Sequence, residues 1–211
     1  MTNIYFSPLP DVEIPNSTVT DYVFRNAGTH PDRVAMIDGV TGLSHTFAEL
    51  TTAIRALAGG LTARGLEVGA IVALMAPNMP EFAIVFHGAA VAGLATTTLN
   101  PTYTAEEIRH QLIDSGAVLL FTIEALAPLA TEAIEGTAVT DVIFLDKAEG
   151  SQRLVGMYGT PSNQVAVDVD EHVVTLPYSS GTTGLAKGVM LTHKNLVANL
   201  AQCGPVLDVH H

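Results

Sequence analysis

The sequence predicts an α/β fold in which helices cover both faces of a mostly parallel sheet. Extended and helical patterns alternate along almost the whole chain, and this order is typical of βαβ units. Residues 70–76 read AIVALMA, an apolar run without alternation, as expected for a strand buried on both faces of a parallel sheet. The composition agrees, because 48% hydrophobic and 14% charged residues in a chain of 211 can fill a sizeable core.

Two capping boxes mark helix starts. Thr46 and Glu49 have the spacing at which a hydroxyl accepts an amide hydrogen bond while a glutamate reaches back to the cap. Thr104 and Glu107 repeat this spacing, and Gly116 is the expected stop of that helix. The predicted helices span residues 18–27, 46–65, 80–92 with proline first, 104–115, 124–135, and 194–202 with Thr192 as cap.

The predicted strands are the apolar or β-branched runs between these helices. They span residues 33–38, 70–76, 94–100, 117–122, 141–146, 172–178 and 188–193. Residues 147–170 are rich in Gly, Pro and Ser, and we interpret them as a linker or surface excursion. Ligands bind at the carboxyl ends of strands in such folds, so the segment after the strand at 172–178 is well placed for a site.

Charge and composition argue against several classes of function. The net charge of -12 disfavours a nucleic-acid footprint and binding to anionic membranes, so a polyanionic ligand would need a local binding device. The single cysteine, Cys203, suits a reducing, cytoplasmic location. The first residues lack the basic and apolar parts of a signal peptide. The most apolar stretch, residues 82–99, fits a helix followed by a strand better than a membrane span.

Residues 176–188 hold an unusual concentration of small and hydroxylated residues, LPYSSGTTGLAKG. Backbone N–H groups in a tight curve bind phosphate, glycine permits the curve, and hydroxyls and a lysine add donors and charge. The P-loop pattern of nucleotide hydrolases does not fit, because Ala186 and Gly188 occupy positions that it needs as Gly and Ser or Thr. The dinucleotide-binding and nucleophile-elbow patterns are also absent, and a flexible connector is the alternative interpretation.

The segment from Leu176 to Lys187 closely resembles the phosphate-binding signature of AMP-forming, adenylate-forming enzymes. This superfamily includes acyl-CoA synthetases, 4-coumarate–CoA ligases, luciferases and adenylation domains. Upstream, LSHTFAEL resembles the family's early L-x-Y-x-E-L segment, with Phe47 in place of tyrosine. TTTLNPTYTAEEI resembles the turn NP-x-Y-x-x-x-E, in the wording of 4-coumarate–CoA ligases and medium- or long-chain acyl-CoA synthetases. The resemblance covers the chain from about residue 15 onward.

The resemblance implies that ATP and Mg²⁺ activate a carboxylic acid to an acyl-adenylate with release of pyrophosphate, and that the acyl group then passes to coenzyme A. Lys187 would neutralise phosphate charge electrostatically, while no catalytic residue and no metal ligand is expected within the chain. The residues expected to bind the ATP phosphates are Ser179, Ser180, Gly181, Thr182, Thr183, Gly184 and Lys187.

The resemblance also implies parts that this sequence lacks. Family members are more than twice as long and carry, beyond the phosphate loop, an adenine and magnesium motif, a ribose-binding aspartate and a mobile domain with the catalytic lysine. We therefore expect residues 1–211 to be an incomplete N-terminal domain, truncated and inactive alone, which self-associates through apolar surface left exposed. Without ATP, residues 179–186 are expected to be mobile.

Several questions stay open at this level. The acid is aryl or fatty, and the acceptor is coenzyme A or, in an acyl-AMP ligase, another group. A stand-alone nucleotide-binding module is a further alternative, and the oligomeric state is open.

Other titratable side chains are interpreted as structural. His87 lies on an apolar helix face and is expected in the core, and His193 beside the last helix cap is expected to serve local structure. Asp114, Glu106 and Glu107 are interpreted as the solvated face of a helix.

Overall fold

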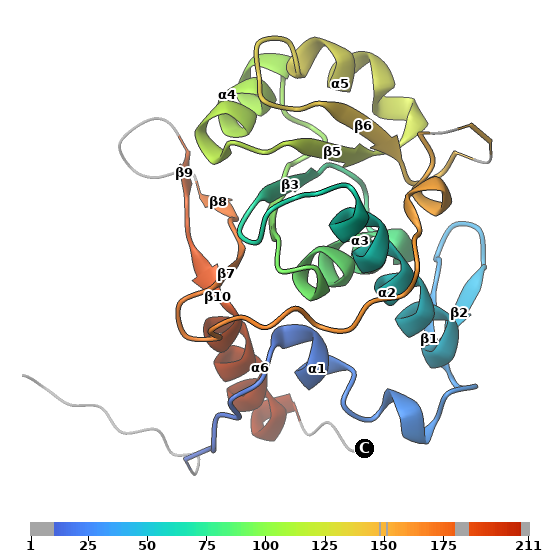
Figure 1. The fold of residues 1–211 in the computed structure, drawn as a ribbon, viewed down its shortest axis with the longest axis vertical. Coiled ribbons are helices and arrows are strands. Elements are labelled where there is room, and N and C mark those ends of the chain that lie inside the picture. The colour runs from blue at the N-terminus through green and yellow to red at the C-terminus, as the bar shows by residue number, and fades with distance from the viewer. Residues whose placement is uncertain (1–10, 148, 151, 180–185, 208–211) are drawn as a thin grey trace, which may run out of the picture.

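The structure, a computed structural model, describes residues 11–147, 149–150, 152–179 and 186–207. A six-stranded sheet lies at its centre (Figure 1). Five neighbouring strands run parallel and the sixth, at one edge, is antiparallel, which confirms the predicted fold class. The order across the sheet is β10 (Leu191–Thr192), β7 (Val173–Thr175), β4 (Ala95–Thr98), β3 (Ile71–Leu74), β5 (Leu119–Thr122) and β6 (Asp141–Phe144).

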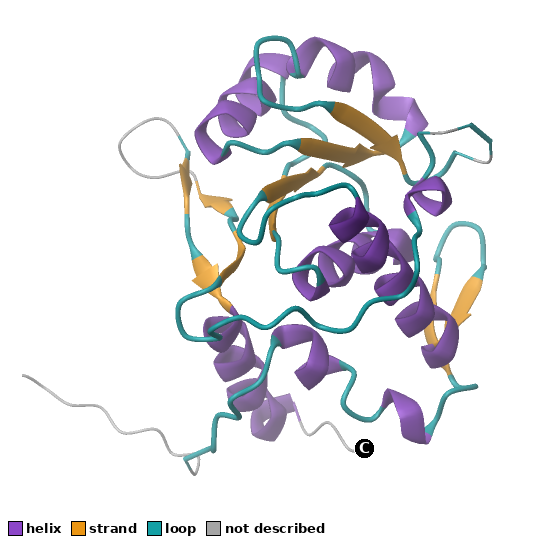
Figure 2. Cartoon of the chain, in the orientation of Figure 1, coloured by secondary structure: helices purple, strands orange, loops and turns teal. Residues whose placement is uncertain are grey.

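Helices cover both faces of this sheet, as Figure 2 shows. On β3, Val72 and Leu74 join the larger core cluster, whereas Ala73, and Met75 directly after the strand, join a second cluster on the opposite face. This two-sided burial explains why the strand is apolar without alternation. The larger cluster involves α2 (Phe47–Ala63) and α3 (Pro80–Val91), and the second involves α4 (Ala105–Ser115) and α5 (Ala127–Ala133). The remaining helices are α1 (Val19–Val23), α6 (His193–Leu207) and the 3₁₀ turns η1 (Ala27–Thr29), η2 (Glu124–Leu126) and η3 (Leu154–Met157).

Three predicted strands differ from the structure. The strand expected at 33–38 is β1 (Val34–Ile37), which pairs with β2 (Ser44–Thr46) in a separate two-stranded sheet. The strand expected at 172–178 ends at Thr175, because Pro177 offers no N–H to a ladder. The chain then forms β8 (Tyr178–Ser179), and the strand expected at 188–193 divides into β9 (Lys187–Gly188) and β10.

Both predicted capping boxes are present. The Glu49 amide donates to the Thr46 hydroxyl at 3.2 Å, and the Thr46 amide donates to the Glu49 carboxylate at 2.8 Å. In the second box the Glu107 amide donates to the Thr104 hydroxyl at 3.3 Å, and the Thr104 amide donates to the Glu107 carboxylate at 2.8 Å. These hydrogen bonds lower the pKa of the Glu107 carboxyl, so Glu107 caps α4 and is more than a solvated side chain.

Part of the segment interpreted as a linker or surface excursion packs closely against α2. The Gly159 amide donates to the Ala56 carbonyl at 2.9 Å, and the Ser162 amide donates to the Arg55 carbonyl at 3.1 Å. A Cβ atom built on Gly60 would lie 1.6 Å from the Met157 carbonyl oxygen. Glycine is therefore required where this segment crosses the helix, since no side chain fits between the two backbones.

Replacing Gly60 with alanine tests this crossing. We expect Gly60→Ala to lower the free energy of unfolding by about 2–3 kcal/mol, because the added methyl group forces two backbones apart. Urea unfolding measures this change in the free energy of unfolding. Gly28→Ala is the control, since a Cβ on Gly28 meets no atom within 4 Å, and its effect should stay within about 0.5 kcal/mol. Equal effects of the two variants would contradict the close crossing.

Histidine side chains attach α1 to the rest of the molecule. His193 is fully buried, and its Nδ1 accepts a hydrogen bond of 3.1 Å from the Val19 amide. Its ring stacks on His172 with centroids 5.6 Å apart. His87 contacts the Thr20 hydroxyl at 3.0 Å from α3. His193 thus serves tertiary structure rather than only the cap of α6.

These histidines predict a pH dependence of stability. Burial, with the neighbouring His172, lowers the pKa of His193 from 6.5 to about 4, and burial lowers the pKa of His87 to about 4. Between pH 6.5 and 4 the unfolded chain therefore binds more protons than the folded chain, so stability falls on acidification.

We expect His193→Asn to flatten this dependence. The contribution of His193 between pH 6.5 and 5 should be about 1.5 kcal/mol. Urea unfolding at pH 7, 6 and 5 measures the slope, and His30→Asn, at an exposed position, serves as control. A slope unchanged by His193→Asn but reduced by His30→Asn would show the assignment to be wrong.

Candidate functional site

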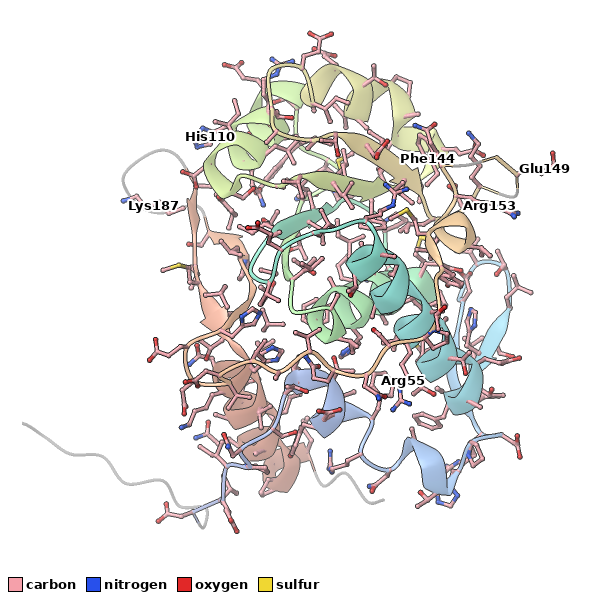
Figure 3. The ribbon with its side chains drawn as sticks, in the orientation of Figure 1. Arg55, His110, Phe144, Glu149, Arg153 and Lys187 are labelled. Carbon is pink, nitrogen blue, oxygen red and sulfur yellow. The ribbon has the colours of Figure 1, made fainter. Side chains whose placement is uncertain are left out.

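The segment singled out from the sequence forms a β-hairpin directly after the carboxyl end of β7. The strands of the hairpin pair antiparallel, with Tyr178 opposite Gly188 and Ser179 opposite Lys187. The Val189 amide closes the stem by donating to the Pro177 carbonyl at 2.9 Å. The hairpin thus brings the first and last predicted phosphate-binding residues side by side. Figure 3 shows Lys187 at the outer end of this stem.

Five of the residues predicted to bind phosphate lie outside the described residues. These residues are Ser180, Gly181, Thr182, Thr183 and Gly184. The expected mobility of residues 179–186 concerns mostly the same positions and stays a prediction. Ser179 and Lys187 are described, and both are exposed, as groups that contact a soluble ligand need to be.

Threonines of β4 anchor the chain where it enters the hairpin. The Leu176 amide donates to the Thr96 carbonyl at 3.0 Å, and the Thr97 hydroxyl donates to the Leu176 carbonyl at 2.9 Å. Gln111 of α4, which is buried, donates in turn to the Thr97 hydroxyl at 2.9 Å. A helix, a strand and the start of the hairpin are therefore joined by one chain of hydrogen bonds.

A second contact from α4 reaches the hairpin itself. The Tyr178 hydroxyl donates to the Asp114 carboxylate at 2.5 Å. Burial and this hydrogen bond raise the pKa of the tyrosine hydroxyl, which therefore stays protonated and able to donate. Asp114 is exposed but holds a partner from 64 residues away, so its interpretation as part of a solvated helix face was incomplete. No local pattern in the sequence indicates this pair.

A cavity of about 350 Å³ lies beside the base of the hairpin. It is bordered by the hairpin, by the carboxyl end of β4 and by α4. Its lining includes Thr98, Asn100, Tyr103, Gln111, Pro177 and Tyr178.

We searched the described residues for a metal site and for membrane-spanning helices. Within them, no group of three or more His, Cys, Asp or Glu side chains could hold a metal ion. No helix in the same part of the chain has the length and apolar character needed to cross a membrane. Among the residues that carry the predicted site, Lys187 supplies a positive charge in a chain whose net charge is -12.

Comparisons with known proteins agree with this arrangement. A family described as AMP-binding enzyme matches residues 23–210. 4-Coumarate–CoA ligase 3 of Oryza sativa subsp. japonica is 41% identical over 207 residues, which cover 94% of this chain and 36% of that protein. A 4-coumarate–CoA ligase of Pinus taeda is 41% identical over 210 residues, covering 95% of this chain and 38% of that protein.

Solved structures show the same fold. A long-chain-fatty-acid–CoA ligase from Archaeoglobus fulgidus matches 98% of this chain and 42% of its own with a TM-score of 0.88 and 25% identity. The chain thus spans less than half the length of the relatives that it matches. Because the family match includes both strands of the hairpin and most of the sheet behind them, the chain belongs to the AMP-binding enzyme family.

Proposed function

We propose that the protein containing this chain activates a carboxylic acid with ATP and then transfers the acyl group to coenzyme A. The observation that carries the proposal is the family match over residues 23–210, together with the hairpin that pairs Ser179 with Lys187. The two plant relatives are named as 4-coumarate–CoA ligases and the archaeal one as a fatty-acid–CoA ligase. Aryl and fatty acids are therefore both candidate substrates.

The first step is an attack of a carboxylate oxygen on the α-phosphorus of ATP. The bond between the α-phosphorus and the bridging oxygen breaks, and pyrophosphate leaves with that oxygen and the electron pair. Two anions must approach each other, so catalysis depends on neutralising charge and holding the phosphates in line. A thiolate of coenzyme A then displaces AMP from the acyl carbon.

We assign the ATP phosphates to the hairpin. Lys187 would lie against the terminal phosphates, and the hydroxyls and amides of residues 179–184 would donate to their oxygens. Mg²⁺ would enter with the ATP phosphates and neutralise part of their charge. The catalytic lysine and the adenine and ribose contacts are assigned to segments other than residues 1–211.

Pyrophosphate exchange tests the reaction. The protein from the complete reading frame that contains this chain should incorporate labelled pyrophosphate into ATP when given an aryl or fatty acid from a panel. Addition of coenzyme A should yield the thioester. Exchange without thioester formation would favour an acyl-AMP ligase, and saturable ATP binding without exchange would favour a nucleotide-binding module. Absence of both exchange and ATP binding would refute the proposal.

Lys187→Ala tests the charge at the hairpin. We expect kcat/KM for ATP to fall about 100-fold, since removing a group that stabilises the transition-state phosphates costs about 3 kcal/mol. The melting temperature should change little, because Lys187 is exposed. Lys194→Ala is the matched control. Lys194 lies on the first turn of α6 and forms a surface ion pair with Asp170.

The two variants separate the binding role from a structural one. A large fall in melting temperature for Lys187→Ala would identify a structural lysine. Equal exchange rates for Lys187→Ala and Lys194→Ala would remove Lys187 from the site.

A further inference from the structure

Besides its attachment to β4, the hairpin is linked by hydrogen bonds to α4 at two points. Gln111 of α4 donates to the Thr97 hydroxyl, which donates in turn to the Leu176 carbonyl, and both hydrogen bonds measure 2.9 Å. Asp114 lies three residues further along the same helix face and accepts from Tyr178. One turn of α4 therefore holds the hairpin at its entry and again inside the stem. In Figure 3, His110 of α4 and Lys187 of β9 lie on the same side of the molecule.

Tyr178 connects both strands of the hairpin to that helix. Gly188 lies opposite Tyr178 in the register, and a Cβ atom on Gly188 would approach the tyrosine ring to 3.1 Å. The ring therefore lies against the backbone of β9 while its hydroxyl binds Asp114 on α4. Any rotation of the stem relative to α4 would have to break this contact.

The stem is not packed against other residues on every side. The cavity of about 350 Å³ lies beside it and is bordered by Pro177 and Tyr178 on one side and by β4 and α4 on the other. Hydrogen bonds to an ionised carboxylate are about twice as strong as neutral ones, and their strength depends on geometry. The Tyr178–Asp114 contact is therefore a directional restraint on the part of the stem that borders this cavity.

We propose that Tyr178 and Asp114 are positioning residues that hold the hairpin in the orientation that binds the phosphates of ATP. This proposal rests on the proposed function, because it needs the hairpin to bind ATP. Neither side chain contacts the reacting atoms. The pair acts through Ser179 and Lys187, which follow Tyr178 and precede Gly188 directly in the chain.

Three variants isolate the contact. Tyr178→Phe keeps the ring over Gly188 and removes only the hydroxyl, Asp114→Ala removes the acceptor, and Asp114→Asn restores a neutral acceptor. Glu106→Ala is the matched control, since it removes an exposed carboxylate from the same helix. All are made in the protein from the complete reading frame and assayed by pyrophosphate exchange, ATP titration and thermal melting.

We expect Tyr178→Phe and Asp114→Ala each to raise KM for ATP about tenfold, with KM for the acid and the melting temperature nearly unchanged. The double variant should be no worse than either single variant, because both remove one contact. Asp114→Asn should recover most of the loss, and Glu106→Ala should behave as the wild type.

The results separate this proposal from the proposed function. A wild-type protein that exchanges pyrophosphate, with variants whose KM for ATP is unchanged or whose effects add, would overturn the positioning role alone. An equal rise in KM for the acid, or a matching loss of melting temperature, would also overturn it, since either indicates a general structural effect.

If the wild type shows no exchange, calorimetric ATP binding decides: a tenfold weaker Kd in Tyr178→Phe supports the role, and an equal Kd refutes it. No ATP binding by the wild type would overturn both proposals.

Discussion

The arrangement of the site depends on the pairing of β4 with β7. The four other parallel strands lie within residues 71–144. β7 follows them in the chain, after the segment that crosses α2. The attachment is short: Thr96 faces Thr175 in the register, and the Thr175 hydroxyl donates to the Thr96 carbonyl at 2.7 Å. This junction brings the hairpin to the carboxyl edge of the sheet, where ligands bind in open α/β folds. The position of the segment that is predicted to bind phosphate therefore depends on this junction.

Local patterns in the sequence predicted most elements of the fold. Capping boxes and apolar runs depend on neighbours within a few residues, so Thr46, Thr104 and the strand at 70–76 are interpreted correctly from the sequence alone. The errors occur where distant segments meet. Residues 157–162 have no periodicity, yet they lie in backbone contact with Gly59 and Gly60, about a hundred residues earlier in the chain.

The candidate site also has a part that the sequence predicts and a part that only the structure shows. The residues predicted to bind phosphate lie close together in the chain, between Ser179 and Lys187, so their types and spacing are sufficient to propose them. The support of the site is not contiguous. Asp114 lies on a polar helix face like any solvated carboxylate, and only the folded chain places it at 2.5 Å from the Tyr178 hydroxyl. A contiguous pattern in the sequence can therefore suggest a ligand-binding segment, whereas a contact between distant side chains becomes visible only in the folded chain.

The polar side chain of Thr97 in β4 is explained by this support, whereas the buried Thr96 hydroxyl has no hydrogen-bond partner among the described residues. A central strand buried on both faces is normally apolar, but β4 contains Thr96 and Thr97, which are both fully buried. Burying a hydroxyl is unfavourable unless it is hydrogen-bonded, and the Thr97 hydroxyl both accepts from Gln111 and donates to Leu176. A valine at this position would keep the β-branched shape but would break the connection between α4 and the hairpin entry. The threonine is better explained by the hairpin that it holds than by the packing of the core.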